Sequence, residues 1–222
     1  MSPLTISEQL FEQLCARSKI ECARIPEQHG VRTADYRVNV PQVPLIVEIK
    51  QLDPTDEDKR LEAVWGTRES PGAIAPSDRV QAQLDAGYPQ IKRSAEGQWP
   101  AMIVVYNNSG PWNWIDSFTV AKAMFGSFGI VLGLQPDQTI SAVGQGYLGQ
   151  RRVTKSTYRA LSVVGVLKCA SADRLTLDCY HNPFATVQAD PQSLSKLAHT
   201  QYIHPNPHDR GFIPWEPTRI QT

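Results

Sequence analysis

Residues 33–51 read TADYRVNVPQVPLIVEIKQ, and this stretch places charged side chains where a buried strand would continue its apolar pattern. Its second half, residues 45–49, is a short apolar run bounded by a proline and a polar residue, which predicts a buried strand. Side chains alternate between the two faces of a strand, so one face of this run is apolar and the other changes from Ile46 to Glu48 and Lys50. We therefore expect the strand to leave the core as it proceeds.

The first half of the stretch predicts a second strand. Apolar and polar side chains alternate between residues 36 and 40, and two prolines mark the connection to residue 45. In an antiparallel pair with so short a connection, the start of one strand lies beside the end of the other. Asp35 should then lie close to Glu48 and Lys50, so that two carboxylates and an ammonium group converge.

Asp35, twelve intervening residues and then Glu48-Ile49-Lys50 resemble the signature of the PD-(D/E)XK nuclease superfamily. Ala34 stands where the family has a proline. The resemblance implies an α/β (α+β) fold: a restriction-endonuclease-like αβββαβ core with a mixed central sheet, extended here by C-terminal strands and helices. It also implies a glutamate on the helix that precedes the hairpin.

The grouped residues have the chemistry that such a site needs. Mg²⁺ or Mn²⁺ takes oxygen ligands, so Asp35 and Glu48 are the predicted metal ligands. An ion held there can acidify a water and neutralise charge on a phosphodiester, while Lys50 is predicted to orient that water or stabilise the transition state. A plainer interpretation is also open, in which Glu48 and Lys50 pair on an exposed strand face and Asp35 caps a turn.

The sequence Thr5-Ile6-Ser7-Glu8 fits a helix capping box, and apolar residues then recur at helical spacing through about residue 19. Glu8 lies nearer the border of the apolar stripe than Glu12 does. Glu8 is therefore the predicted fourth catalytic residue, and Glu12 is expected in solvent. The capping box accounts for Glu8 equally well.

The chain is expected to hold a nuclease-like core at residues 1–110 and an extension at 111–222 that packs on the same core, since 222 residues suffice for one well-buried core. In the core we expect a short strand at 22–25, an inserted helix at about 53–65, a loop at 66–76, a helix that starts with a Ser77-Asp78 cap, and a buried strand at 101–106. In the extension we expect helices at 116–125 and 191–198 and strands at 130–134, 160–168 and 175–180, all joining the same sheet.

The charge balance limits how nucleic acid could bind. Lys plus Arg and Asp plus Glu both total 22, so the chain lacks the global positive field that binds nucleic acid indiscriminately. The densest basic group contains Arg151, Arg152 and Lys155, followed by Tyr158 and Arg159. These first three are the predicted nucleic-acid-binding residues, with a solvated loop as the competing interpretation.

Other features favour the absence of further cofactors. The four cysteines include no Cys-x-x-Cys pair, and the sequence shows no signal peptide or membrane-length apolar run, which predicts a cytoplasmic protein with no membrane partner. Gly144, Gly146 and Gly149 lack the lysine pattern of a phosphate-binding loop and are expected in an ordinary loop. The histidines of the C-terminal region match no standard zinc module.

These observations favour a Mg²⁺- or Mn²⁺-dependent phosphodiester hydrolase, foremost a DNA endonuclease, with nucleic acid as its partner and a homodimer left open. An alternative is a catalytically inactive restriction-endonuclease-like module that binds nucleic acid or protein, because a fold does not establish chemistry. A third is a scaffold that binds a small molecule or a metal through the carboxylates.

Overall fold

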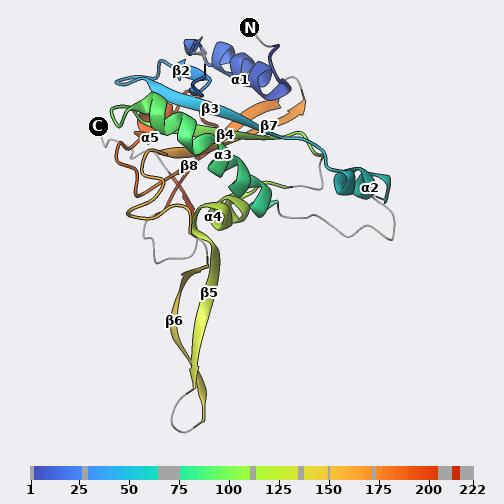
Figure 1. Ribbon diagram of the computed structural model, residues 1–222, viewed down its shortest axis with the longest axis vertical. Helices are drawn as coiled ribbons and strands as arrows, with labels where there is room; N and C mark the ends of the chain where they lie inside the picture. The colour runs from blue at the N-terminus through green and yellow to red at the C-terminus, as the bar shows by residue number, and fades with distance from the viewer. Residues whose placement is uncertain are drawn as a thin grey trace, which may run out of the picture.

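The computed structural model describes residues 3–26, 30–64, 76–110, 114–134, 138–149, 151–171, 174–204 and 212–215. Within these ranges the chain forms a mixed α/β structure with five helices, one large sheet and a separate two-stranded ribbon (Figure 1). The helices are α1 (Ile6–Arg17), α2 (Asp56–Val64), α3 (Ser77–Ala95), α4 (Ser117–Phe125) and α5 (Pro191–Leu194). The large sheet contains β1 (Cys22–Arg24), β2 (Tyr36–Val38), β3 (Leu45–Leu52), β4 (Ala101–Asn107), β7 (Val163–Ser171), β8 (Arg174–His181), β9 (Thr200–Ile203) and β10 (Ile213–Pro214). The ribbon consists of β5 (Ser127–Leu134) and β6 (Ile140–Leu148).

The large sheet has the strand order β1-β2-β3-β4-β7-β8-β9-β10. Its centre is parallel, because β3 pairs with β4 and β4 pairs with β7 in the same direction. The pairs β1–β2, β2–β3, β7–β8 and β9–β10 are antiparallel, and β8–β9 is parallel. The sheet therefore continues past residue 110, since β7 lies directly beside β4.

Helices cover both faces of this sheet (Figure 1). On one face, α3 and α4 pack in a core that includes Ile46, Ile103 and Val164. On the other face, α1 packs in a second core that includes Leu45 and Val47. The alternation predicted for residues 45–50 is thus confirmed. The first five residues of β4 are buried, as expected for a central strand covered on both faces.

The first helix forms for the reason that its sequence suggests. Thr5 is its N-cap: the Thr5 hydroxyl accepts a hydrogen bond from the Glu8 backbone, and the Glu8 carboxylate accepts one from the Thr5 backbone. This capping box satisfies donors at the helix start, while Phe11 and Leu14 enter the core. The predicted helix is confirmed.

The expected order of helix, three strands, helix and strand is present as α1-β1-β2-β3-α3-β4, with α2 inserted before α3. β3 is longer than predicted: it continues to Leu52, which is buried, so the strand does not leave the core at its charged residues. Of the predicted loop at 66–76, all but Pro76 lies outside the described residues.

Four other predictions about the elements are wrong. Ser77 does not cap α3, because the N-cap position is Pro76 and Ser77 is already helical. Gly144 and Gly146 lie in β6 rather than in a loop, where they pair with the backbone of β5 and present no side chain. β5 pairs with β6 alone and does not join the large sheet. The helix predicted at 191–198 ends at Leu194.

Two short strands, β9 and β10, were not predicted, since their few residues carry too little periodicity. No helix in the described ranges is long and apolar enough to cross a membrane.

Candidate metal and catalytic site

The β2–β3 hairpin places Asp35 beside Glu48. Tyr36, the first residue of β2, pairs with Val47, so the preceding residue, Asp35, lies next to the residue that follows Val47. The Asp35 Oδ2 atom accepts a hydrogen bond from the Ile49 backbone N–H at 2.7 Å, which fixes the carboxylate against β3. The predicted approach of the two carboxylates is confirmed.

Glu48 is a charged residue in the core, with only 1% of its surface exposed. Its Oε1 atom accepts a hydrogen bond from Lys50 Nζ at 2.6 Å. Its Oε2 atom is buried and accepts no hydrogen bond from a donor group in the described ranges. A hydrogen bond with the Asp35 carboxyl, which requires a proton on one of the two groups, contributes to the raised pKa of Glu48. A buried carboxyl oxygen is costly to leave unsatisfied, so Glu48 Oε2 needs a proton, a cation or a substrate group to complete its surroundings.

Both carboxyl groups of the site have raised pKa values. Burial raises the pKa of Glu48 to about 8, the charge of Asp35 adds to the effect, and Lys50 opposes it. Burial also raises the pKa of Asp35, with Glu8 adding to the effect and the hydrogen bond from Ile49 opposing it. Glu48 therefore holds a proton at neutral pH, and the pair carries negative charge that Lys50 does not balance only when both carboxyl groups are ionised.

Helix α3 covers this pair closely at Gly87. A Cβ atom at Gly87 would lie 3.2 Å from Glu48 Cγ, 3.2 Å from Ile103 Cδ1 and 3.3 Å from Lys50 Cε. A glycine thus allows the helix backbone to approach the charged side chains. One turn further, Gln90 Oε1 accepts a hydrogen bond from Lys50 Nζ at 3.1 Å, and Gln90 donates to the Thr33 carbonyl.

The start of α1 forms the other border of the site. The backbone N–H of Ser7 donates to Gln51 Oε1 on β3 at 3.0 Å. Glu8 is buried, and its oxygens accept hydrogen bonds from Thr5 and from Arg24, the latter at 2.9 Å. The charge of Glu8 contributes to the raised pKa of Asp35, so the two carboxylates interact. The capping role of Glu8 is confirmed, and its catalytic role stays a prediction.

The sequence predicted that Glu12 would lie in solvent, and this prediction is wrong. It is half-buried and accepts a hydrogen bond from the Tyr36 hydroxyl at 2.9 Å, so it ties α1 to β2. The plainer interpretation of the motif is also wrong, because Glu48 is not on an exposed face. Asp35 accepts its hydrogen bond from Ile49 across the hairpin rather than from a turn.

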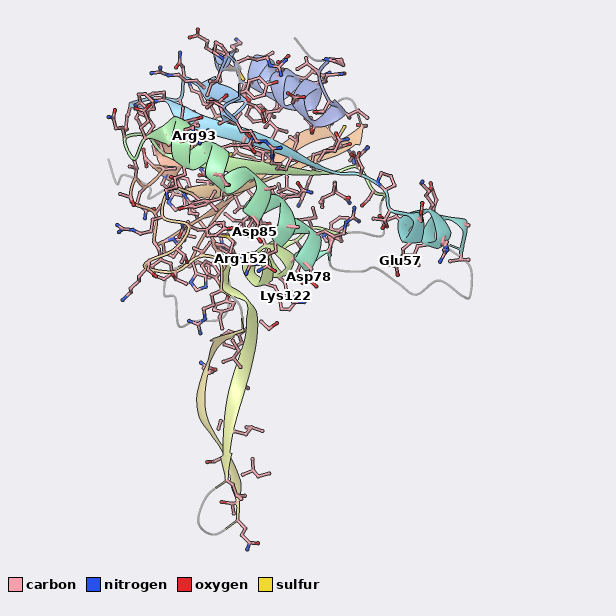
Figure 2. All side chains as sticks on the ribbon, viewed as in Figure 1. Glu57, Asp78, Asp85, Arg93, Lys122 and Arg152 are labelled. Carbon is pink, nitrogen blue, oxygen red and sulfur yellow. The ribbon has the colours of Figure 1, made fainter. Side chains whose placement is uncertain are left out.

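The predicted basic group divides into bound and exposed residues. Arg152 makes a two-pronged ion pair with Asp85 on α3, with nitrogen–oxygen distances of 2.8 and 3.0 Å (Figure 2). Burial alone would raise the pKa of Asp85, but hydrogen bonds from Arg152 and Tyr158 lower it. Arg151 and Lys155 are exposed beside this anchor. The loop is therefore attached to α3, while two of its three predicted contact residues face solvent.

Beside this loop lies a cleft of about 360 Å³, whose lining includes Tyr88, Lys92, Trp99 and Arg159. The Arg37 guanidinium lies 4.9 Å from the centre of the Trp99 ring. Cations interleaved with aromatic rings suit a nucleic-acid strand, because phosphates and bases can be contacted together.

No group of three or more His, Cys, Asp or Glu side chains within the described ranges is arranged to hold a metal ion. The histidines of the C-terminal region agree with this: His181 bonds to Gln201, and His204 lies 3.3 Å from the Tyr147 hydroxyl. His208 lies outside the described residues.

The sequence did not single out Gly87 and Gln90. These residues lie on one face of α3, since they are spaced three residues apart. The available signal was the pair Gly87 and Pro89 in the middle of a helix, where both residues weaken helix formation. Weak helix formers in the middle of a helix indicate that another part of the chain packs closely against the helix backbone there.

Comparison with known proteins found no matching family model, no matching curated protein and no matching solved structure. The resemblance to PD-(D/E)XK nucleases thus depends on the motif Asp35…Glu48-Ile49-Lys50 and on the arrangement of these residues.

Proposed function

We propose that this protein is a divalent-metal-dependent phosphodiester hydrolase of the PD-(D/E)XK type that acts on DNA, with a restriction-endonuclease-like fold. The observation that carries the proposal is the buried Glu48 carboxyl, which accepts a hydrogen bond from Lys50 on one oxygen and interacts with the Asp35 carboxyl. Asp35 lies beside it on the neighbouring strand.

These residues fit a Mg²⁺ or Mn²⁺ ion. Asp35 and Glu48 offer hard oxygen ligands, and a divalent cation would displace the proton of Glu48 and neutralise the two ionised carboxylates. Such an ion, when bound, supplies a more acidic water and stabilises charge on a phosphodiester. Only two carboxylates converge here, which suits an ion that keeps several waters and a substrate phosphate as its other ligands.

Lys50 is held for a specific task. Two of its three N–H donors are directed to Glu48 and Gln90. The third can donate to an attacking water or to a phosphate oxygen, and its direction is set by the other two bonds. A donor fixed in this way stabilises charge that develops in the transition state without having to reorganise.

The candidate DNA contacts lie beside α3, on the face of the helix opposite to Gly87 and Gln90. Arg151 and Lys155 offer phosphate contacts, and the cleft lined by Lys92, Trp99 and Arg159 offers both cations and an aromatic ring. Arg152 would position this loop through Asp85 rather than contact phosphate itself.

The test is single-turnover cleavage of single-stranded, duplex and branched DNA and of RNA, with Mg²⁺ or Mn²⁺. Wild type should cut at least one DNA substrate, and Lys50→Ala should lower the rate at least about a hundredfold. Lys59→Ala, which removes an exposed lysine on α2, is the matched control and should cut like wild type. Binding without lysine-dependent cutting would favour the non-catalytic module.

A further inference from the structure

The β5–β6 ribbon, called the arm below, extends away from the rest of the structure (Figure 1). Its two strands pair only with each other in the described part of the chain. An isolated two-stranded ribbon is at best marginally stable in water, because it has no third strand or helix to cover its apolar face. The arm therefore calls for a partner surface.

One face of the arm is mostly apolar. The alternation along β5 places Phe128, Ile130, Leu132 and Leu134 on one face. On β6, Ile140 lies opposite Leu134 and the polar Gln145 lies opposite Ile130, with a register shift between Val131 and Leu132. The exposed fractions are 59% for Ile130, 63% for Leu132, 72% for Leu134 and 69% for Ile140. We call these four residues the apolar stripe. A contiguous apolar surface of this kind marks an interaction site.

The stripe leads into a hollow at the base of the arm. The hollow measures about 200 Å³, and its lining includes the apolar or aromatic Phe118, Ala121, Phe128 and Tyr147 and one cation, Lys122. Phe128 pairs directly with Tyr147, so the hollow opens on the same face as the stripe. Phe118 is exposed at its edge. The arm thus carries an apolar projection at its tip and a mostly apolar recess at its base.

The charge pattern selects the partner. Between residues 127 and 149 the only charged residue is Asp137, so the arm offers no cations for phosphate and no ion pairs for a charged protein. Neither strand carries the lysine or proline that commonly protects a free edge from pairing. Both strands are uncharged and unprotected, and Lys122 is the one cation that lines the hollow in the described part of the chain. A surface with such a projection and recess is suited to a copy of itself, and the net charge of zero adds no repulsion between copies.

We propose that two copies of this chain form a two-fold dimer in which the apolar faces of their arms pack antiparallel. In this arrangement the tip of each arm reaches the base of the other, so Leu134 and Ile140 of one copy enter the hollow of the second. The contact is isologous and closed, which fits the most common symmetry of soluble oligomers.

The available surface is sufficient for such a dimer. The eight residues of β5 give a ribbon about 27 Å long, and stacked sheets pack about 10 Å apart. Covering the stripe, the adjacent backbone and the hollow buries on the order of 500 Å² per copy, or about 1,000 Å² in total, which reaches the lower limit for a specific interface. The dimer does not depend on the chemistry of Asp35 and Glu48.

Sedimentation velocity from about 1 to 200 µM tests the proposal in the range where an interface of this size is populated. Wild type should dimerise, and Leu132→Glu with Leu134→Glu should raise the dissociation constant at least about tenfold. Phe118→Glu should have a similar effect from the opposite side of the contact. Ile6→Glu is the control, since it places the same charge at an exposed apolar residue on α1 and should leave the dimer unchanged.

Thermal unfolding of each variant confirms that the body stays folded. A wild type that remains monomeric at 200 µM would overturn the proposal, and so would a dimer that the arm variants do not weaken. Flotation with phosphatidylcholine vesicles is a second measurement. A monomer that binds vesicles through Leu132 and Leu134 would assign the stripe to a lipid surface and overturn the dimer.

Photo-crosslinking tests the antiparallel arrangement. A photoreactive phenylalanine analogue in place of Leu134 should link two copies, with the linked peptide containing Phe118, Phe128 or Tyr147. Links from one tip to the other tip would overturn the antiparallel packing. The same analogue in place of Ile6 is the control and should give no linked dimer.

Discussion

The candidate site and the arm depart from ordinary side-chain placement in opposite directions. At the site, the charged Glu48 is 1% exposed and touches the apolar core. On the arm, large apolar residues such as Leu132 and Leu134 are exposed. A buried charge and an exposed apolar surface are the two informative exceptions to the usual distribution, because each has a free-energy cost that folding alone does not recover.

The difference shows what each region lacks. The site is covered by α3, and the charge of its buried carboxyl groups can be neutralised by a proton or by a small cation. The arm is open along its length, and it lacks a large apolar surface. One region is therefore suited to an ion and the other to a protein, and substitutions should affect them in different ways.

The largest expected effect is on metal binding. Glu48→Gln and Asp35→Asn keep the side-chain volume but remove a carboxylate, so each should lower Mn²⁺ affinity at least about tenfold without unfolding the protein. Isothermal calorimetry measures this affinity. Arm variants such as Leu132→Glu are the control for the comparison and should bind Mn²⁺ like wild type. Unchanged affinity in both site variants would place the ion elsewhere.

The second effect is the pH dependence of the site. Because the pKa of Glu48 is about 8, metal binding below that pH must release its proton. Mn²⁺ affinity should therefore rise about tenfold per pH unit between about pH 6 and 7.5. Calorimetry in buffers of different ionisation enthalpy should show the released proton, and affinity that is constant over this range would contradict the raised pKa.

The same shift affects metal-free stability. The folded-state pKa of about 8 lies above the ordinary value of 4.5, so between these values the folded protein holds a proton that the unfolded chain lacks. This contribution to stability is complete below about pH 4.5 and is lost as the pH rises toward 8. Between pH 5 and pH 8.5, the melting temperature of metal-free Glu48→Gln should therefore fall less than that of metal-free wild type.

A smaller effect is expected where α3 covers the site. Gly87→Ala should favour the helix by up to about 1 kcal/mol, but its Cβ would press on Glu48 and Lys50. We expect Mn²⁺ affinity to fall a few-fold while the melting temperature changes little. Ala86→Gly, at the neighbouring exposed position, is the matched control: it should lower stability by about 1 kcal/mol and leave the affinity unchanged.

The smallest effect should appear in the stability of the arm. Ile130→Ser removes an apolar side chain that is already in solvent, so the free energy of unfolding of the monomer should change by less than about 0.5 kcal/mol. Ile103→Ala, in the core beneath α3, should cost about 2–5 kcal/mol. Chemical denaturation at low protein concentration measures both. A large cost at Ile130 would mean that the arm is part of the folded core.

The sequence predicted the local features of this fold well. The capping box at Thr5, the hairpin that joins Asp35 to Glu48 and the buried strand β4 all follow from patterns within ten to twenty residues. Such patterns reflect backbone geometry and hydrophobic periodicity, which a short segment carries by itself.

What could not be predicted depends on contacts between distant segments. Gln90 reaches Lys50 across 40 residues of chain, and Arg152 reaches Asp85 across 67. β5 reads like any sheet strand, and only the tertiary structure shows that it leaves the body. The burial of Glu48 was also unexpected, because a charge in a strand normally signals an exposed face.

The attachment of the loop at 151–160 to α3 has a mechanical consequence. Asp85, which holds Arg152, stands two residues before Gly87 on the same helix, and Gln90 follows one turn later. Helix α3 therefore connects the basic loop with the two α3 residues that border the ammonium group of Lys50. Under the proposed function, a contact of DNA with Arg151 or Lys155 that displaced α3 as a rigid body would also displace Gly87 and Gln90 at the site.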